Sequence, residues 1–168
     1  MQYIHRQIEG SLTSLAKQFS ALAITGPRQC GKSTLLRELF STSYRYITFD
    51  DPVVREQALS DPKLFLEQLT DKVILDEVQY VPQLFSYLKM VIDANRQKKG
   101  LFLLAGSQQF SLMKNLGDSL AGRIALLELL PFHIQEKKTI PSLKEECLRP
   151  MDGFIHASLV GSYPEVVL

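Results

Sequence analysis

The stretch "TGPRQCGKSTLL", Thr25 to Leu36, places two glycines, a lysine and two adjacent hydroxyl side chains at the end of the apolar run "ALAIT". Gly26, Gly31, Lys32 and Ser33 have the spacing G-x-x-x-x-G-K-[ST]. Glycines let backbone N–H groups turn toward a bound anion, and the helix predicted from "STLLREL" offers its positive end. The stretch therefore predicts a phosphate-binding loop between a strand and a helix. The alternative is a glycine turn with a solvated lysine.

Apolar runs of strand length recur on both sides of this loop. They are Ala21–Thr25, Tyr44–Phe49, Lys72–Asp76, Leu101–Ala105 and Ile124–Leu130. Most lack the alternation of a sheet with one wet face, and helix-like segments such as "PQLFSYLKMVIDANRQ" lie between them. The pattern predicts an α/β fold with three layers, in which a five-stranded parallel sheet carries helices on both faces.

Three helix starts are indicated by aspartates. Asp51 and Asp61 each precede a proline, as an N-cap precedes proline at the first helical position, so two short helices are expected there. Near the end, "MDGFIHASLVG" predicts another short helix with Asp152 as its N-cap and Gly161 as its stop.

Composition narrows the class of protein. The 168 residues suit one domain, and 45% hydrophobic with 22% charged residues is typical of folded globular chains. A net charge of +1 provides no global attraction to nucleic acid or to an anionic membrane. Cys30 and Cys147 are read as free thiols, and no run reaches the length of a membrane span, so a cytoplasmic protein without a membrane partner is expected.

A nucleotide site of the P-loop kind needs a lysine for phosphates and oxygen ligands for a metal. Lys32 is expected to reach the β and γ phosphates, and the Ser33 hydroxyl to ligate Mg²⁺. "KVILDEVQ" ends a strand with two carboxylates, of which Asp76 would hold the magnesium through its water shell and Glu77 would deprotonate an attacking water. An acidic loop capping the next helix is the alternative for this pair.

Two further polar residues are candidates for catalysis. Ser107 follows the strand in "LFLLAGSQQ", where it would contact the γ-phosphate or the attacking water, and a helix N-cap explains it as well. Arg123 precedes the last strand, at the end away from the loop. It would complete a neighbouring subunit's site, or else it is a surface arginine.

Other residues of the loop region carry weaker hypotheses. Cys30, among N–H groups beside Lys32, is predicted to have a lowered pKa and to oxidise easily, although incidental variation also explains a cysteine there. Arg28 and Arg37 flank the loop, and surface or acidic-partner roles are expected for them.

Taken in order, "GPRQCGKSTLL", "VILDEVQ", "LLAGSQ", "SLAGR" and "GSYPEVV" resemble the AAA+ ATPase domain of a bacterial and archaeal family that carries a further C-terminal domain of unknown function. The resemblance covers Tyr3 to about Phe132, with a weaker match from Gly161. It implies ATP and Mg²⁺ as cofactors, Asp76 and Glu77 as the Walker B pair, Ser107 as sensor 1 and Arg123 as an arginine finger. The Walker A loop implied to bind the nucleotide comprises Gly26, Pro27, Arg28, Gln29, Cys30, Gly31, Lys32, Ser33 and Thr34.

The same resemblance divides the chain. Residues 1–132 would form the AAA+ core, and residues 133–168 a short helical extension toward a lid or C-terminal domain absent from this chain. The sensor-2 arginine usual on an AAA+ lid cannot be located.

The function expected is an ATP-hydrolysing AAA+ module that couples nucleotide state to movement of attached domains or partners. The alternative is a nucleotide-dependent binding switch with negligible hydrolysis. Homo-oligomerisation would follow if Arg123 acts in trans, whereas direct nucleic-acid binding is not expected, because the helix dipole explains the basic end "RQKKG". The guanine-reading motif [NT]-K-x-D is absent from the sequence, and the client is not indicated.

Overall fold

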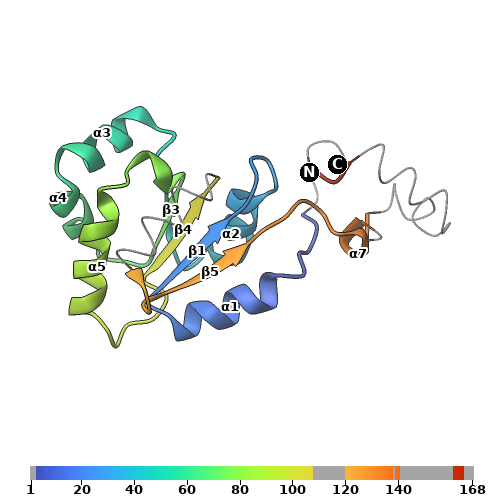
Figure 1. The fold of residues 1–168 in the computed structure, drawn as a ribbon, viewed down its shortest axis with the longest axis horizontal. Coiled ribbons are helices and arrows are strands. Elements are labelled where there is room, and N and C mark those ends of the chain that lie inside the picture. Colours follow the sequence, from blue (N-terminus) through green and yellow to red (C-terminus); the bar gives the residue numbers. More distant parts are fainter. Residues whose placement is uncertain (1–2, 108–119, 138, 141–160, 165–168) are drawn as a thin grey trace.

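The apolar runs form one parallel sheet in a computed structural model that describes residues 3–107, 120–137, 139–140 and 161–164. Within these residues, five strands follow the order β2-β3-β4-β1-β5, and every neighbouring pair is parallel (Figure 1). They are β1 (Ala21–Thr25), β2 (Arg45–Thr48), β3 (Val73–Asp76), β4 (Phe102–Gly106) and β5 (Ile124–Glu128). The predicted five-stranded sheet is confirmed, with strand ends that differ from the apolar runs by a residue or two.

The central strands are buried on both faces, which explains their unbroken apolar sequences. In β1, Leu22 and Ile24 pack on one side of the sheet while Ala21 and Ala23 pack on the other. Every residue of β1, β3 and β4 is buried, whereas the edge strands β2 and β5 keep exposed positions. A strand buried on both faces has no reason to alternate apolar and polar residues.

Helices cover both faces, so the predicted three layers are present. One face carries α1 (Glu9–Gln18) and α2 (Lys32–Phe40), whose Leu12, Leu35 and Leu36 join the core there. The other carries α3 (Pro52–Ser60), α4 (Pro62–Glu67) and α5 (Leu84–Ala94). Figure 1 shows these last three gathered on the side of the strands opposite α1.

Both predicted aspartate caps are confirmed. The Asp51 carboxylate accepts a hydrogen bond from Val53 N at 2.8 Å, and the Asp61 carboxylate accepts one from Leu64 N at 2.9 Å. Each is followed by proline at the start of its helix, so α3 and α4 are separate helices as expected.

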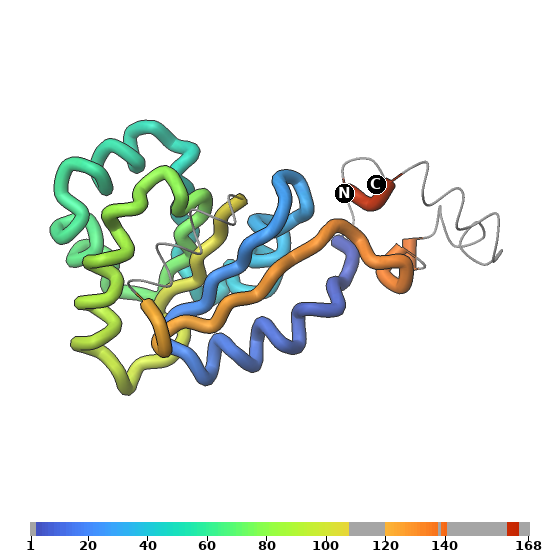
Figure 2. Tube along the Cα trace, in the orientation of Figure 1, coloured from blue at the N-terminus to red at the C-terminus, as the bar shows by residue number. Residues whose placement is uncertain are grey.

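The chain leaves the sheet after β5 and continues into α7 (Ile134–Lys137), beside the segment that precedes α1 (Figure 2). Ile4, Phe132 and Ile140 form a small core of their own there. The helix predicted from Asp152, and Cys147, lie outside the described residues. Gly161 is described, with a φ of 82°. None of the described helices is both long and apolar enough to cross a membrane.

Candidate functional site

The glycine-rich loop joins β1 to α2, and its backbone requires glycine at two positions. Gly26 has a φ of 146°, and a Cβ built there would lie 2.1 Å from the Leu129 carbonyl oxygen. Gly31 has a φ of 96° and serves as the N-cap of α2 without a side-chain hydrogen bond. Since no side chain caps the helix, its first N–H groups face the loop and are available to an anion.

Lys32 lies at the centre of the loop. Its side chain is buried, and Nζ donates hydrogen bonds to the carbonyl oxygens of Gly26 at 3.0 Å and Pro27 at 2.7 Å. The lysine is therefore held inside the turn by the loop's own backbone, where an anion can replace those carbonyls.

A cavity of about 330 Å³ opens beside the loop. It is lined by Gln29, Gly31, Lys32, Ser33, Thr34, Glu77 and Pro164. Two larger hollows of about 450 Å³ lie elsewhere, one over α3 and α4 and one around Arg123. We assign the site to the smaller cavity, because it adjoins the carboxyl ends of the parallel strands, where ligands of such sheets bind.

The remaining predicted loop residues take different positions. Pro27 is half-buried and supplies a carbonyl to Lys32, whereas the Arg28 side chain is exposed, as expected. Cys30 is fully buried, and desolvation raises the pKa of its thiol although the Lys32 charge opposes that rise. The predicted lowering of the pKa is therefore wrong, since burial outweighs the helix terminus and the cation.

Asp76 ends β3 and is almost completely buried, with 2% of its surface exposed. One carboxylate oxygen accepts a hydrogen bond from Glu77 N at 3.0 Å, and the other accepts one from the Tyr46 hydroxyl at 2.5 Å. The Ser33 side chain lies near the Tyr46 hydroxyl and opposes the rise in its pKa, so both predicted metal ligands adjoin one phenol. Burial and the Asp76 hydrogen bond raise the pKa of Tyr46 to about 12.

Glu77 turns out of the strand into a left-handed conformation, with a φ of 56°, and caps the 3-10 helix η1 (Val78–Tyr80). Its carboxylate accepts a hydrogen bond from Gln79 Nε2 and another from Ser107 Oγ at 3.3 Å. Gln79 Nε2 also lies 3.3 Å from Ser107 Oγ. The structure thus brings the predicted Glu77 and Ser107 together.

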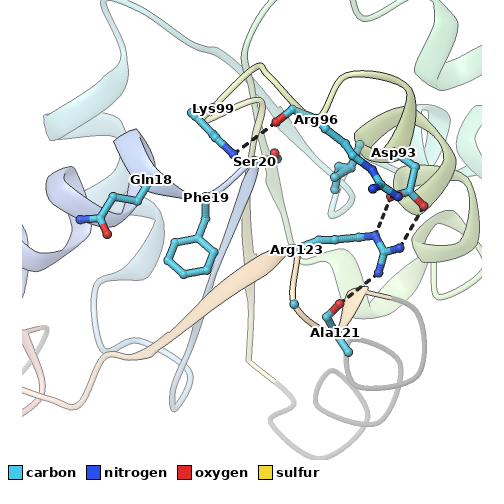
Figure 3. A pocket seen from close by; sticks show the side chains of 10 residues that line it. Gln18, Phe19, Ser20, Asp93, Arg96, Lys99, Ala121 and Arg123 are labelled. Carbon is cyan, nitrogen blue, oxygen red and sulfur yellow. Dashed lines mark hydrogen bonds and ion pairs between the residues drawn. The ribbon is translucent and has the colours of Figure 1, made fainter.

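Arg123 lies at the opposite edge of the sheet. It precedes Ile124, which pairs with Ala21 at the start of β1, while the loop follows the end of β1. Figure 3 shows its guanidinium reaching Asp93 of α5, with Nε 2.7 Å from Oδ1 and Nη2 3.2 Å from Oδ2. These hydrogen bonds from Arg123 hold the pKa of Asp93 below its usual value.

Three polar residues near the loop were not predicted as site residues. Tyr46 and Gln79 contact the Walker B pair directly. Arg6 is buried and donates to the carbonyl oxygens of Cys30 at 2.9 Å and Leu130 at 2.6 Å. Gln79 could have been predicted, because it closely follows the two acids in "KVILDEVQ". No local sequence pattern marks Tyr46 or Arg6.

A glycine-rich loop joins a strand to a helix, and two carboxylates lie at the end of β3, in a sheet of order 2-3-4-1-5. Together these features define a P-loop ATPase domain of the AAA+ class. A family model described as "AAA domain" matches residues 18–137, and the chain belongs to that family. The family match thereby confirms the resemblance to an AAA+ ATPase domain and the prediction of a nucleotide-binding ATPase domain. The additional C-terminal domain stays a prediction.

The chain is also similar to a curated relative and to several solved structures. An uncharacterized protein of Mycobacterium tuberculosis is 40% identical over 107 residues, which are 63% of this chain and 24% of that protein. The chain thus spans about a quarter of that relative. The Walker-type ATPase of Pyrococcus abyssi superposes with a TM-score of 0.65 at 18% identity, covering 98% of this chain and 66% of that one. A structure titled "Structural Basis for Katanin Self-Assembly" superposes with a TM-score of 0.60 at 14% identity, and the match covers 98% of this chain and 66% of that chain. At these identities the structural matches show the fold.

Proposed function

We propose that this domain binds ATP with Mg²⁺ and hydrolyses it. The observation that carries the proposal is the meeting of Lys32, Ser33 and Glu77 around one cavity at the carboxyl edge of the sheet, with Asp76 beside them. Ser107 directly follows β4, which lies between β1 and β3 in the sheet and so reaches the same edge.

The residues present fit both cofactors. A side chain in place of either glycine would strain the loop that surrounds the phosphate site. The recorded partners of Lys32 are only the loop carbonyls and the Cys30 sulfur. Phosphate oxygens would replace the carbonyls. For Mg²⁺, Ser33 and Asp76 offer the hard oxygen donors that the ion prefers. Bound Mg²⁺ would neutralise charge that develops on the phosphate oxygens.

In this proposal each side chain has one role. Lys32 holds the β and γ phosphates, Ser33 and Asp76 hold the metal, and Glu77 accepts the proton of the attacking water. Ser107 orients that water or the γ-phosphate. Glu77 must first exchange its hydrogen bond from Gln79 for one from the water, because the Gln79 amide occupies one of its carboxylate oxygens.

The finer proposals concern assembly and coupling. Arg123 stands at the far edge of the sheet, so it would act on a neighbour's nucleotide after releasing Asp93. The self-assembly described for katanin supports such an arrangement by analogy of fold. Nucleotide-driven movement of attached domains is proposed because the matched segment covers only 24% of the relative's length. The buried thiol of Cys30 suits a reducing, cytoplasmic location.

One observation favours the alternative of a nucleotide-operated switch with negligible turnover. Gln79 and Ser107 both donate to the Glu77 carboxylate, which leaves the proposed base occupied in this conformation. A switch of this kind would bind ATP and change shape without consuming it.

Phosphate release with ATP and with GTP separates the two. Hydrolysis that Glu77→Gln abolishes, while Mg·ATP binding persists, supports the ATPase. Binding without release in the wild type supports the switch. Lys32→Ala should weaken ATP binding by roughly ten- to a hundredfold, since one charge-assisted contact is lost. Unchanged affinity in that variant would remove the phosphate assignment.

A further inference from the structure

We propose that Tyr46 is a positioning residue for the magnesium ligands. Its hydroxyl fixes the Asp76 carboxylate, beside Ser33, in the arrangement that receives Mg·nucleotide. The inference rests on the proposed nucleotide site, but not on hydrolysis.

The sheet register brings the phenol to this place. Tyr46 on β2 pairs with Ile74 on β3, and Asp76 follows Ile74 by two residues, so all three side chains share the face covered by α2. From that face the hydroxyl donates to Asp76 Oδ2 at 2.5 Å and lies near the Ser33 side chain in the first turn of α2.

α2 also holds the ring itself. Arg37 follows Ser33 by one helical turn, and its guanidinium carbon lies 3.9 Å from the centre of the Tyr46 ring. A cation above the ring and the hydrogen bond to Asp76 at its tip leave the phenol little freedom. The hydroxyl is thus a fixed donor rather than a mobile one.

Asp76 depends on this donor. The buried carboxylate has two recorded hydrogen bonds, from Glu77 N to one oxygen and from Tyr46 to the other. A carboxylate that lost the second could rotate about its side-chain bond, away from the orientation in which it meets the metal's water shell. Partners that orient metal ligands typically contribute about 10- to 100-fold in metal affinity.

The chain supplies a matched control in Tyr44, two residues earlier. Tyr44 is buried against Phe40, with the Lys72 amine 5.5 Å from its ring, away from Asp76. Tyr44→Phe and Tyr46→Phe remove the same atom from a buried and a half-buried tyrosine two residues apart. An effect of lost stability or packing would appear in both, whereas an effect on the metal ligands would appear only in Tyr46→Phe.

The test is an equilibrium titration of a fluorescent ATP analogue at varied Mg²⁺ concentration, with a parallel series in EDTA. For Tyr46→Phe we expect the half-saturating Mg²⁺ concentration to rise about tenfold or more, with affinity in EDTA unchanged. Tyr44→Phe should match the wild type. In an Asp76→Asn background, Tyr46→Phe should add no further shift, because the residue acts through that carboxylate.

Several results would overturn the inference. They are an unchanged or lower Mg²⁺ requirement in Tyr46→Phe, an equal loss of affinity in EDTA, a shift that persists in Asp76→Asn, and wild-type binding that is indifferent to Mg²⁺. If the expected shift appears in a protein that releases no phosphate, the role of Tyr46 stands and the ATPase proposal fails.

Discussion

Replacing Arg6 by methionine should destabilise the fold and loosen the phosphate-binding loop. The guanidinium is 5% exposed and its Nε lies 3.2 Å from the Glu136 carboxylate. It also donates to the carbonyl oxygens of Cys30 in the loop and Leu130 after β5. One side chain therefore ties the segment before α1 to the loop and to α7.

The magnitude follows from what Glu136 retains. Removing one partner of a buried ion pair costs about 3 to 5 kcal/mol, because the other charge stays buried without compensation. Glu136 keeps hydrogen bonds from the N–H groups of Gln7 and His133, both at 2.8 Å, so we expect the lower end, about 3 kcal/mol. For a domain of this size that corresponds to a melting temperature lower by roughly 6 to 12 °C.

Thermal unfolding followed by circular dichroism measures this, and two further variants sharpen it. Arg6→Met combined with Glu136→Gln should regain part of the loss, since no uncompensated charge remains. Arg96→Met is the control, because its ion pair with Asp93 is exposed and should contribute less than about 1 kcal/mol. If Arg6→Met has the same melting temperature as the wild type, or the double variant melts at a lower temperature than Arg6→Met, the reasoning about the buried pair is wrong.

Three further predictions concern the site. Gln79→Ala should free the Glu77 carboxylate and raise phosphate release by up to about tenfold without changing ATP affinity, and a fall in rate would mean that Gln79 assists the water instead. Arg123→Ala should bind ATP normally yet hydrolyse it on the order of 10³-fold more slowly, and mixing with Lys32→Ala should restore some turnover. Activity independent of Arg123 would exclude the trans role. Because burial raises the pKa of the Cys30 thiol, iodoacetamide at pH 8 should label it at least about tenfold more slowly in the folded than in the urea-unfolded chain; equal rates would contradict this.

The sheet was predictable because burial on both faces leaves a direct mark in the sequence. Runs such as Ala21–Thr25 and Leu101–Ala105 have no alternation, and only a parallel sheet under two helical layers accounts for several such runs in one domain. The Asp51 and Asp61 caps were predictable for a similar reason, since their partners lie within three residues.

Apart from the contact between Gln79 and Glu77, two residues apart, the missed contacts join residues far apart in the sequence. Tyr46 and Asp76 are 30 positions apart, Arg6 and Cys30 are 24, and Gln7 and Glu136 are 129. No local spacing encodes such pairs, because strand order and loop paths decide them. The error at Cys30 has the same origin, since a motif reveals the neighbouring charges but not the depth of burial.

The pair Asp76–Glu77 illustrates a second limit. Consecutive residues of a strand point to opposite faces, so an unbroken strand would separate the two carboxylates. The left-handed turn at Glu77 ends the strand between them and directs its side chain toward Gln79 and Ser107. Such a conformation costs a non-glycine residue about 1 to 2 kcal/mol, and the hydrogen bonds at the Glu77 carboxylate offset it. The two acids can be read from the sequence, but the backbone turn that lets them serve one site depends on Gln79 of η1 and on Ser107, which follows β4.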